Sequence, residues 1–106
     1  MMMNEWEVIS PLIKRKIFTP GAELMSMVIV FQKGGIGAEH AHPHEQLGYV
    51  ISGEIRITLD GAARIIRAGE QVIVPGNVVH GVEALEDTVL LEVFTPLRKD
   101  LLAGLT

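Results

Sequence analysis

The stretch of sequence that decides the fold class lies in the middle of the chain and reads Glu54-Ile55-Arg56-Ile57-Thr58-Leu59-Asp60-Gly61. Polar and apolar residues alternate strictly over its first six positions, so an extended strand here has one apolar face and one polar face. Asp60-Gly61 then favours a two-residue hairpin, because glycine accepts the positive φ that such a turn requires. We expect Ala63 to Ile66 to form the return strand. The stretch therefore predicts a β-hairpin with one buried face.

The same pattern of short apolar runs between turn residues extends over the rest of the chain. The 11 glycines and 5 prolines fall at regular intervals, which is typical of many short strands joined by turns. The further strands predicted in this way are 24–32, 46–52, 71–74 and 88–94, and only 97–102 looks like a helical turn. We therefore expect an all-β sandwich or barrel, in which closure removes exposed strand edges.

Length and composition limit what the chain does. We expect a single domain over residues 1–106, with an N-terminal strand region at 1–20 and a short C-terminal tail at 97–106. The net charge is −4, and we interpret the short basic run Lys14-Arg15-Lys16 as a solvated strand edge, which argues against a nucleic-acid partner. The chain has no cysteine, which favours the cytoplasm, and no apolar stretch of membrane-spanning length, which argues against a membrane partner.

Three of the four histidines fall in one segment, His40-Ala41-His42-Pro43-His44-Glu45-Gln46. Residues two apart on a strand face the same way, so parity nominates His40, His42, His44 and Gln46. We expect Pro43, which has no N–H for a sheet, to bend the chain and take His44 off this face. Only a barrel or sandwich brings His80 back against the others. Imidazole is the commonest metal ligand at neutral pH, so the segment indicates a metal site, with a purely structural role as the alternative.

The spacing of these residues resembles the two conserved motifs of the cupin superfamily. The first motif is matched by five residues at its usual spacing: Gly34, then His40 after a gap of five residues, His42 after one, Gln46 after three and Gly53 after six. Gly69, five residues, Pro75 and, five positions later, His80 resemble the second. The resemblance implies a double-stranded β-helix (jelly-roll) barrel that holds one divalent metal, Zn, Ni, Mn or Fe, through His40, His42, Gln46 and His80.

The chain departs from the cupin pattern at three positions. Gln46 replaces the usual glutamate ligand, Asn77 replaces the usual glycine two residues after Pro75, and Ala84 replaces an asparagine. A carboxamide oxygen binds a cation without neutralising it, so an ion held by three imidazoles and Gln46 keeps its full charge toward an anionic ligand. This donor set suits an acidic sugar better than it suits oxygen chemistry.

A second chemically informative segment near the C-terminus reads Glu92-Val93-Phe94-Thr95-Pro96-Leu97-Arg98. Glu92 and Phe94 share one face of a strand, but parity alone leaves open whether that face points inward. An inward carboxylate is costly unless it is paired or functional, and a simple pairing of Glu92 with Arg98 is one alternative. Together with residues 40–54 this segment resembles the small pectin-degradation cupins, which open the ring of unsaturated uronates and usually have aspartate at the Glu92 position.

This resemblance implies an enzyme of carbohydrate metabolism with a small acidic sugar as substrate. The metal would anchor a substrate oxygen, Glu92 would move a proton, Arg98 would hold the substrate carboxylate, and Phe94 would form a wall for the sugar ring. An iron-dependent cupin oxygenase and a non-enzymatic cupin that binds a small ligand remain the alternatives.

We also expect a homodimer, because a domain of this size gains from additional burial. Residues 6–18 are apolar enough to add to the sheet of a neighbouring chain. The side chains expected to contribute are Trp6, Val8, Ile13 and Ile17.

Overall fold

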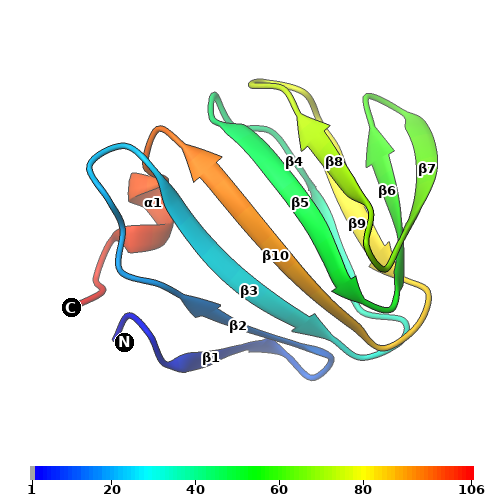
Figure 1. The fold of residues 1–106 in the computed structure, drawn as a ribbon, viewed down its shortest axis with the longest axis horizontal. Coiled ribbons are helices and arrows are strands. Elements are labelled where there is room, and N and C mark those ends of the chain that lie inside the picture. The colour runs from blue at the N-terminus through cyan, green and yellow to red at the C-terminus, as the bar shows by residue number, and fades with distance from the viewer. Residues whose placement is uncertain (1) are drawn as a thin grey trace.

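The computed structural model describes residues 2–106, which form ten strands and one short helix (Figure 1). The strands are β1 (Trp6–Ser10), β2 (Ile13–Ile17), β3 (Met25–Phe31), β4 (Ile36–His40), β5 (Glu45–Ser52), β6 (Glu54–Leu59), β7 (Ala62–Arg67), β8 (Gln71–Val74), β9 (His80–Ala84) and β10 (Thr88–Thr95). The helix is α1 (Lys99–Leu102). Over the described range, no helix is long and apolar enough to cross a membrane.

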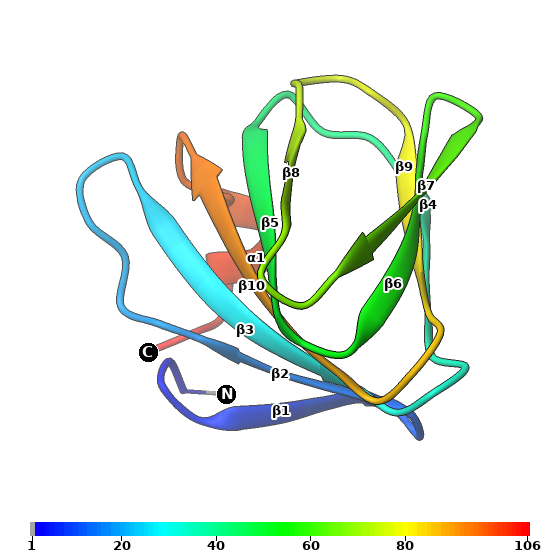
Figure 2. The ribbon, with the colours of Figure 1, turned by 45° about the vertical axis from the view of Figure 1, so that its right-hand side comes forward.

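Two antiparallel sheets make up the barrel. The larger has the strand order β1-β2-β3-β10-β5-β8, and the smaller has the order β4-β9-β6-β7. Strands from both sheets surround a common interior, with β8 and β5 on one side and β6, β9 and β4 on the other (Figure 2). Neighbours in each sheet are mostly far apart in sequence, which is the crossing pattern of a jelly roll. The predicted all-β barrel is confirmed.

The central hairpin forms as its sequence predicts. Leu59 pairs with Ala62, so Asp60 and Gly61 make a two-residue turn, and both have positive φ, 48° and 82°. The strands predicted at 24–32, 46–52, 71–74 and 88–94 correspond to β3, β5, β8 and β10 with ends that agree to within one residue. Strands β4 and β9 were not predicted, because glycine and charged residues interrupt their apolar pattern.

The N-terminal hairpin pairs with the sheet of its own chain, β1 with β2 and β2 with β3. Ile13 and Ile17 are buried in the chain's own core, so the prediction that they contribute to contacts with a neighbouring chain is wrong. Trp6 and Val8 remain exposed on β1, the edge strand. The N- and C-terminal ends of the chain lie near each other (Figures 1 and 2), and the Met3 N–H donates a hydrogen bond to the Thr106 carbonyl oxygen.

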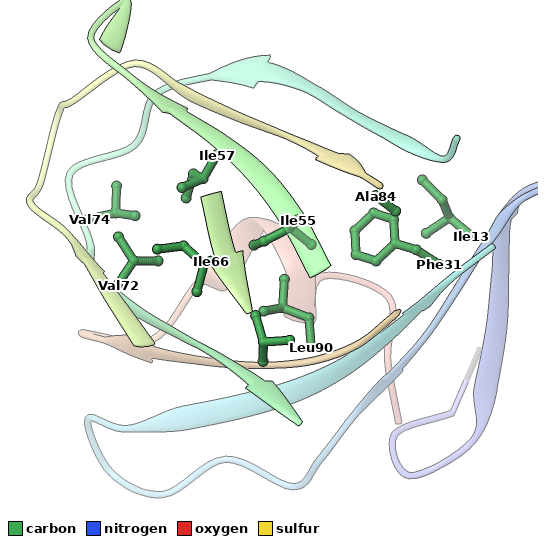
Figure 3. Close-up of a cluster of buried hydrophobic side chains, with 10 residues drawn as sticks. Ile13, Phe31, Ile55, Ile57, Ile66, Val72, Val74, Ala84 and Leu90 are labelled. Atoms are coloured by element: carbon green, nitrogen blue, oxygen red, sulfur yellow. The ribbon is translucent and has the colours of Figure 1, made fainter. Parts of the chain in front are cut away.

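The side chains of the main apolar cluster point toward one another in the interior of the barrel (Figure 3). Its members face one another from both sheets, and they are Ile13, Phe31, Val50, Ile55, Ile57, Ile66, Val72, Val74, Ala84 and Leu90. Burying one large aliphatic side chain of this kind contributes about 1.5–3 kcal/mol. A second cluster, of Ile17, Met25, Met27 and Phe94, packs against α1 and its neighbours. Members of both clusters, Ile13 and Phe31 of the first and Met27 of the second, line one cavity in the barrel.

Candidate metal and substrate site

Three chain segments meet at one end of the barrel and bring four ligand-type side chains there. His40 is the last residue of β4, and its register partner is His80, the first residue of β9. His42 lies in the loop after β4, and Gln46 is the second residue of β5. His42, Gln46 and His80 are buried, whereas His40 is exposed. The barrel therefore brings the distant His80 against the first group of histidines.

A turn before β9 holds the loop that carries His42. The Asn77 N–H donates a hydrogen bond of 2.7 Å to the His42 carbonyl oxygen. Gly76 packs so closely here that an added Cβ would lie 2.5 Å from the Pro43 carbonyl oxygen. Asn77 has a φ of 67°, in the left-handed region that asparagine tolerates better than most residues. The replacement of the usual cupin glycine by Asn77 thus preserves the turn.

Backbone carbonyl groups orient the three clustered imidazoles. The Nδ1 atoms of His40, His42 and His80 lie 3.0, 3.2 and 2.8 Å from the carbonyl oxygens of Ala38, His44 and Val78, respectively. Because a carbonyl oxygen only accepts, each Nδ1 carries a proton, and in the neutral imidazole the Nε2 then has the lone pair that binds metals. Such outer hydrogen bonds are usual for histidines that bind metals.

The resulting donor atoms fit a divalent cation. One ligand nitrogen from each of the three histidines lies within 4.8 Å of the others. The buried His80 Nε2 has no hydrogen-bond partner in the described part of the chain. His42 Nε2 lies 3.1 Å from Gln46 Oε1. Two ligands at about 2.1 Å from one ion are about 3 Å apart, so this spacing fits a shared cation.

Electrostatics keep two of these histidines neutral, the form that binds metals. Burial lowers the pKa of His42, and the Arg98 charge lowers it further. Burial is also the main cause that lowers the pKa of His80. Deprotonating these imidazoles for metal binding therefore costs little at neutral pH.

Glu92 points into the barrel, which answers the question that parity left open. Its side chain is on β10, is only 8% exposed and lines the same cavity as His40 and His80. Burial raises the pKa of Glu92 to about 7, although the positive charges of Arg98 and Arg15 partly oppose the shift. A carboxyl with this pKa takes up and releases protons at neutral pH.

Arg98 is 7% exposed and also lines the cavity. Its Nε and Nη2 atoms donate to the two carboxylate oxygens of Asp100, at 3.0 and 2.7 Å, and not to Glu92. These hydrogen bonds hold the pKa of Asp100 down at about 2. The guanidinium lies over the Phe94 ring, 5.0 Å from its centroid. Asp100 therefore occupies the fork-shaped edge of Arg98 that the sequence analysis assigned to a substrate carboxylate.

Phe94 and His44 take supporting positions. Phe94 is 1% exposed and belongs to the second apolar cluster, below Arg98 and 5.9 Å from the His42 ring, and it does not line the cavity. His44 turns toward the C-terminal segment, where its Nε2 lies 3.1 Å from the Leu97 carbonyl oxygen. Pro43 and His44 form a bend, and His44 is outside the metal-compatible group of histidines, as predicted.

The cavity lined by His40, His80, Glu92 and Arg98 has a volume of about 400 Å³. Its polar lining consists of Arg15, His40, Gln46, His80, Glu92 and Arg98, and most of the remaining lining is apolar. This size and composition are typical of sites for small molecules.

Arg15 is the lining residue that the sequence analysis missed. The interpretation of Lys14-Arg15-Lys16 as a strand edge is wrong, because β2 pairs with β1 on one side and β3 on the other. Lys14 is exposed and Lys16 half-buried, and their Nζ atoms lie 4.6 and 4.7 Å from the centroid of the Trp6 ring. The Arg15 side chain lines the cavity. The signal was present, because Arg15 has the same strand parity as the buried Ile13 and Ile17.

The sequence pattern of the cupin domain matches residues 27–94, and the chain therefore belongs to the cupin family. Pectin degradation protein KdgF of Dickeya dadantii (strain 3937) is 39% identical over 99 residues, which cover 92% of this chain and 90% of that protein. The predicted resemblance to the small pectin-degradation cupins is thus confirmed over nearly the whole chain.

Two solved structures have the same fold. KdgF from Halomonas sp. superposes with a TM-score of 0.86 at 34% identity, covering 92% of this chain and 90% of that one. An RmlC-like cupin from Shewanella frigidimarina NCIMB 400 superposes with a TM-score of 0.86 at 37% identity, covering 92% of this chain and 88% of that one. The barrel assignment therefore agrees with structures of similar sequence.

Proposed function

We propose that the protein is a metal-dependent enzyme that opens the ring of small unsaturated uronates and converts the product to a ketone. The observation that carries this proposal is a cluster of three histidines, two of which, His40 and His80, line the same cavity as a buried carboxyl, Glu92, with a pKa of about 7. The likeness to a pectin degradation protein supports the substrate class, because pectin is a polymer of uronates.

The proposed metal ligands are His40, His42, Gln46 and His80. All four are neutral, so they leave the charge of the ion available to the substrate. A divalent ion such as Zn, Ni, Mn or Fe would supply Lewis-acid stabilisation of the negative charge that develops on oxygen as a hemiacetal opens. The ligands have a second task, because the hydrogen bonds from Nδ1 to backbone carbonyls keep each Nε2 directed at the same point.

Glu92 is the proposed proton carrier. As a carboxylate it would take the proton of the anomeric hydroxyl while the bond from C1 to the ring oxygen breaks and C1 becomes an aldehyde. As a carboxylic acid it would return that proton to C4 of the resulting enolate, which gives the ketone and completes an isomerisation without any other reactant. A pKa of about 7 populates both forms at neutral pH.

Arg98 would stabilise the negative charge that the ring oxygen carries between these two proton transfers. Asp100 engages its Nε and Nη2, so the contact to substrate would come from Nη1. The Phe94 ring supports the guanidinium from below, and we therefore assign Phe94 to positioning Arg98 rather than to contact with the sugar.

The experiment that tests this function follows the ultraviolet absorbance of an unsaturated uronate. We expect the metal-loaded wild type to remove this absorbance faster than the spontaneous reaction, and a chelator to abolish the difference. Glu92→Gln should slow the reaction by about 10²–10⁴-fold, and Arg98→Ala should also slow it. The exposed Glu86→Gln and Arg56→Ala are matched controls that should keep the full rate.

Two results would contradict the proposal. If Glu92→Gln keeps the full rate, Glu92 does not carry the proton. If the wild type does not exceed the spontaneous rate with any of the four metals, the protein is not this enzyme, and the alternative of a ligand-binding cupin takes its place.

We further propose that the protein acts as a homodimer in the cytoplasm, the compartment that suits a chain without cysteine. The exposed side chains of Trp6 and Val8 on the edge strand β1 support an intermolecular contact there. A monomeric mass by light scattering at micromolar concentration would contradict the dimer.

A further inference from the structure

Arg15 is a charged side chain directed into the barrel from the N-terminal hairpin. It lies on β2 between the buried Ile13 and Ile17, with the same parity, and its side chain is 22% exposed. It lines the cavity together with Glu92 and Arg98. A guanidinium in such a place is costly unless something compensates its charge.

Glu7 compensates only one side of this guanidinium. Its Oε1 accepts a hydrogen bond of 2.6 Å from Arg15 Nε, across the β1–β2 pair. Among the hydrogen bonds and ion pairs of residues 2–106, none involves Nη1 or Nη2 of Arg15. Arg98 differs, because Asp100 holds its Nε–Nη2 edge with both oxygens. Of the two cavity arginines, Arg15 is the one with a complete two-nitrogen edge left for a ligand.

The strand register places Arg15 farther from the histidines than Glu92 is. Gln46 is level with Phe94 on β10, and Arg15 is level, across β3, with Leu90 of β10. Glu92 stands between Leu90 and Phe94 on the same inward face. The Gln46, Glu92 and Arg15 side chains therefore occupy successive levels along the cavity, with the metal ligands at one end and Arg15 at the other.

The surroundings of Arg15 favour a carboxylate as the occupant of this edge. Ile13, Ile29 and Phe31 line the cavity on this side, and an apolar lining strengthens a charged hydrogen bond because less water competes for it. A carboxylate matches the planar, two-nitrogen edge of a guanidinium. Burial raises the pKa of Glu92 to about 7, so this carboxyl does not fully compensate the positive charge of Arg15 at neutral pH.

We infer that Arg15 is a substrate-binding residue, which holds the carboxylate of a sugar acid through Nη1 and Nη2 while the other end of the sugar reaches the histidines. This inference rests on the proposed function for the identity of the sugar. It assigns selection for acidic over neutral sugars to Arg15, and it leaves Arg98 to the reacting oxygen.

The test compares the binding of D-galacturonate and D-galactose by calorimetric titration of the metal-loaded protein. The two sugars differ only at C6, where galacturonate has a carboxylate and galactose a hydroxymethyl group. The wild type should bind galacturonate more tightly. Arg15→Gln should weaken galacturonate binding by about tenfold or more and leave galactose binding unchanged, because a paired, charged hydrogen bond is lost. Arg15→Lys, which keeps the charge but not the fork, should fall between the two.

Two control variants separate binding from structure. Glu7→Gln breaks the same ion pair but keeps the Arg15 side chain, so it should retain the preference for galacturonate. Arg56→Gln removes an arginine from a surface ion pair between β6 and β9 and should change nothing. If Glu7→Gln loses the preference as fully as Arg15→Gln does, the role of Arg15 is structural and the inference is wrong.

The remaining outcomes decide between the subsite and the reaction. If the wild type binds both sugars equally, the proposed carboxylate subsite does not exist. If Arg15→Gln fails to fold, Arg15→Lys replaces it in the test, and an unchanged preference for galacturonate in Arg15→Lys also rules the subsite out. The Arg15 variants are also assayed with an unsaturated uronate. If they are active and their KM equals that of the wild type, Arg15 does not bind the substrate carboxylate. A wild type that is inactive but prefers galacturonate through Arg15 contradicts only the proposed reaction and supports the subsite.

Discussion

Two buried polar side chains at opposite ends of the barrel, Thr88 and His80, differ in how their hydrogen-bonding groups are satisfied. Thr88 lies near the start of β6, where its Oγ1 accepts from the Glu54 N–H at 3.1 Å and lies 2.9 Å from the Glu86 carbonyl oxygen. His80 pairs with Leu59 at the other end of β6. Its Nε2 is buried without any partner in the described chain.

This difference separates the part of the barrel that stabilises the fold from the part available for chemistry. Around Thr88 the interior is apolar and every polar group of the side chain is used, which is the usual condition of a folded core. Around His80 the interior contains an unused ligand atom and a carboxyl with a raised pKa. Such costly groups are expected where binding energy compensates for them.

The largest expected effect is a loss in the free energy of unfolding when a buried residue at the apolar end is truncated. Ile55 is fully buried, so Ile55→Ala should lower the free energy of unfolding of the metal-free protein by about 2–5 kcal/mol. Ile51→Ala, on the same type of residue but at an exposed position, is the matched control and should cost much less. Urea unfolding measures both, and a similar small loss in the two variants would show that the apolar end does not dominate stability.

A smaller effect is expected from pH at the polar end. The pKa of Glu92 is raised from 4.5 to about 7, so the folded chain holds a proton that the unfolded chain has lost between these values. Its stabilising contribution is therefore complete below pH 4.5 and is lost as the pH rises through 7, by about 3 kcal/mol in all. Urea unfolding of the metal-free wild type between pH 5 and 8 should show this decline, and Glu92→Gln should lack it. Parallel pH profiles would contradict the burial of an ionisable Glu92.

Much of the fold could be predicted from sequence because its strands are marked locally. The alternation in Glu54 to Leu59 and the Asp60-Gly61 turn determine the β6–β7 hairpin without help from distant residues. Strands β4 and β9 were missed because their positions depend on pairing with each other and, for β9, also with β6. Local alternation is absent in both, so only the assembled sheet defines them.

The candidate site was predictable to the extent that motif spacing marks it. His40, His42, Gln46 and His80 do lie together, whereas the side-chain partners of Arg98 and the direction of Glu92 depended on the whole barrel. Asp100 is two residues from Arg98, and no spacing rule in the sequence indicated that it would take the guanidinium edge. Arg15 was missed because two outward lysines flank it, although its parity with Ile13 and Ile17 was visible.

The most direct test of the account is the metal content of three purified proteins, because all further chemistry depends on the histidine cluster. Elemental analysis should find about one divalent metal ion per chain in the wild type and in His44→Ala, whose imidazole Nε2 faces the Leu97 carbonyl oxygen and which is outside the metal-compatible group. His80→Ala removes the unpartnered Nε2, and its metal content should fall to near zero. Equal metal content in the wild type and His80→Ala would show that this end of the barrel is not a metal site.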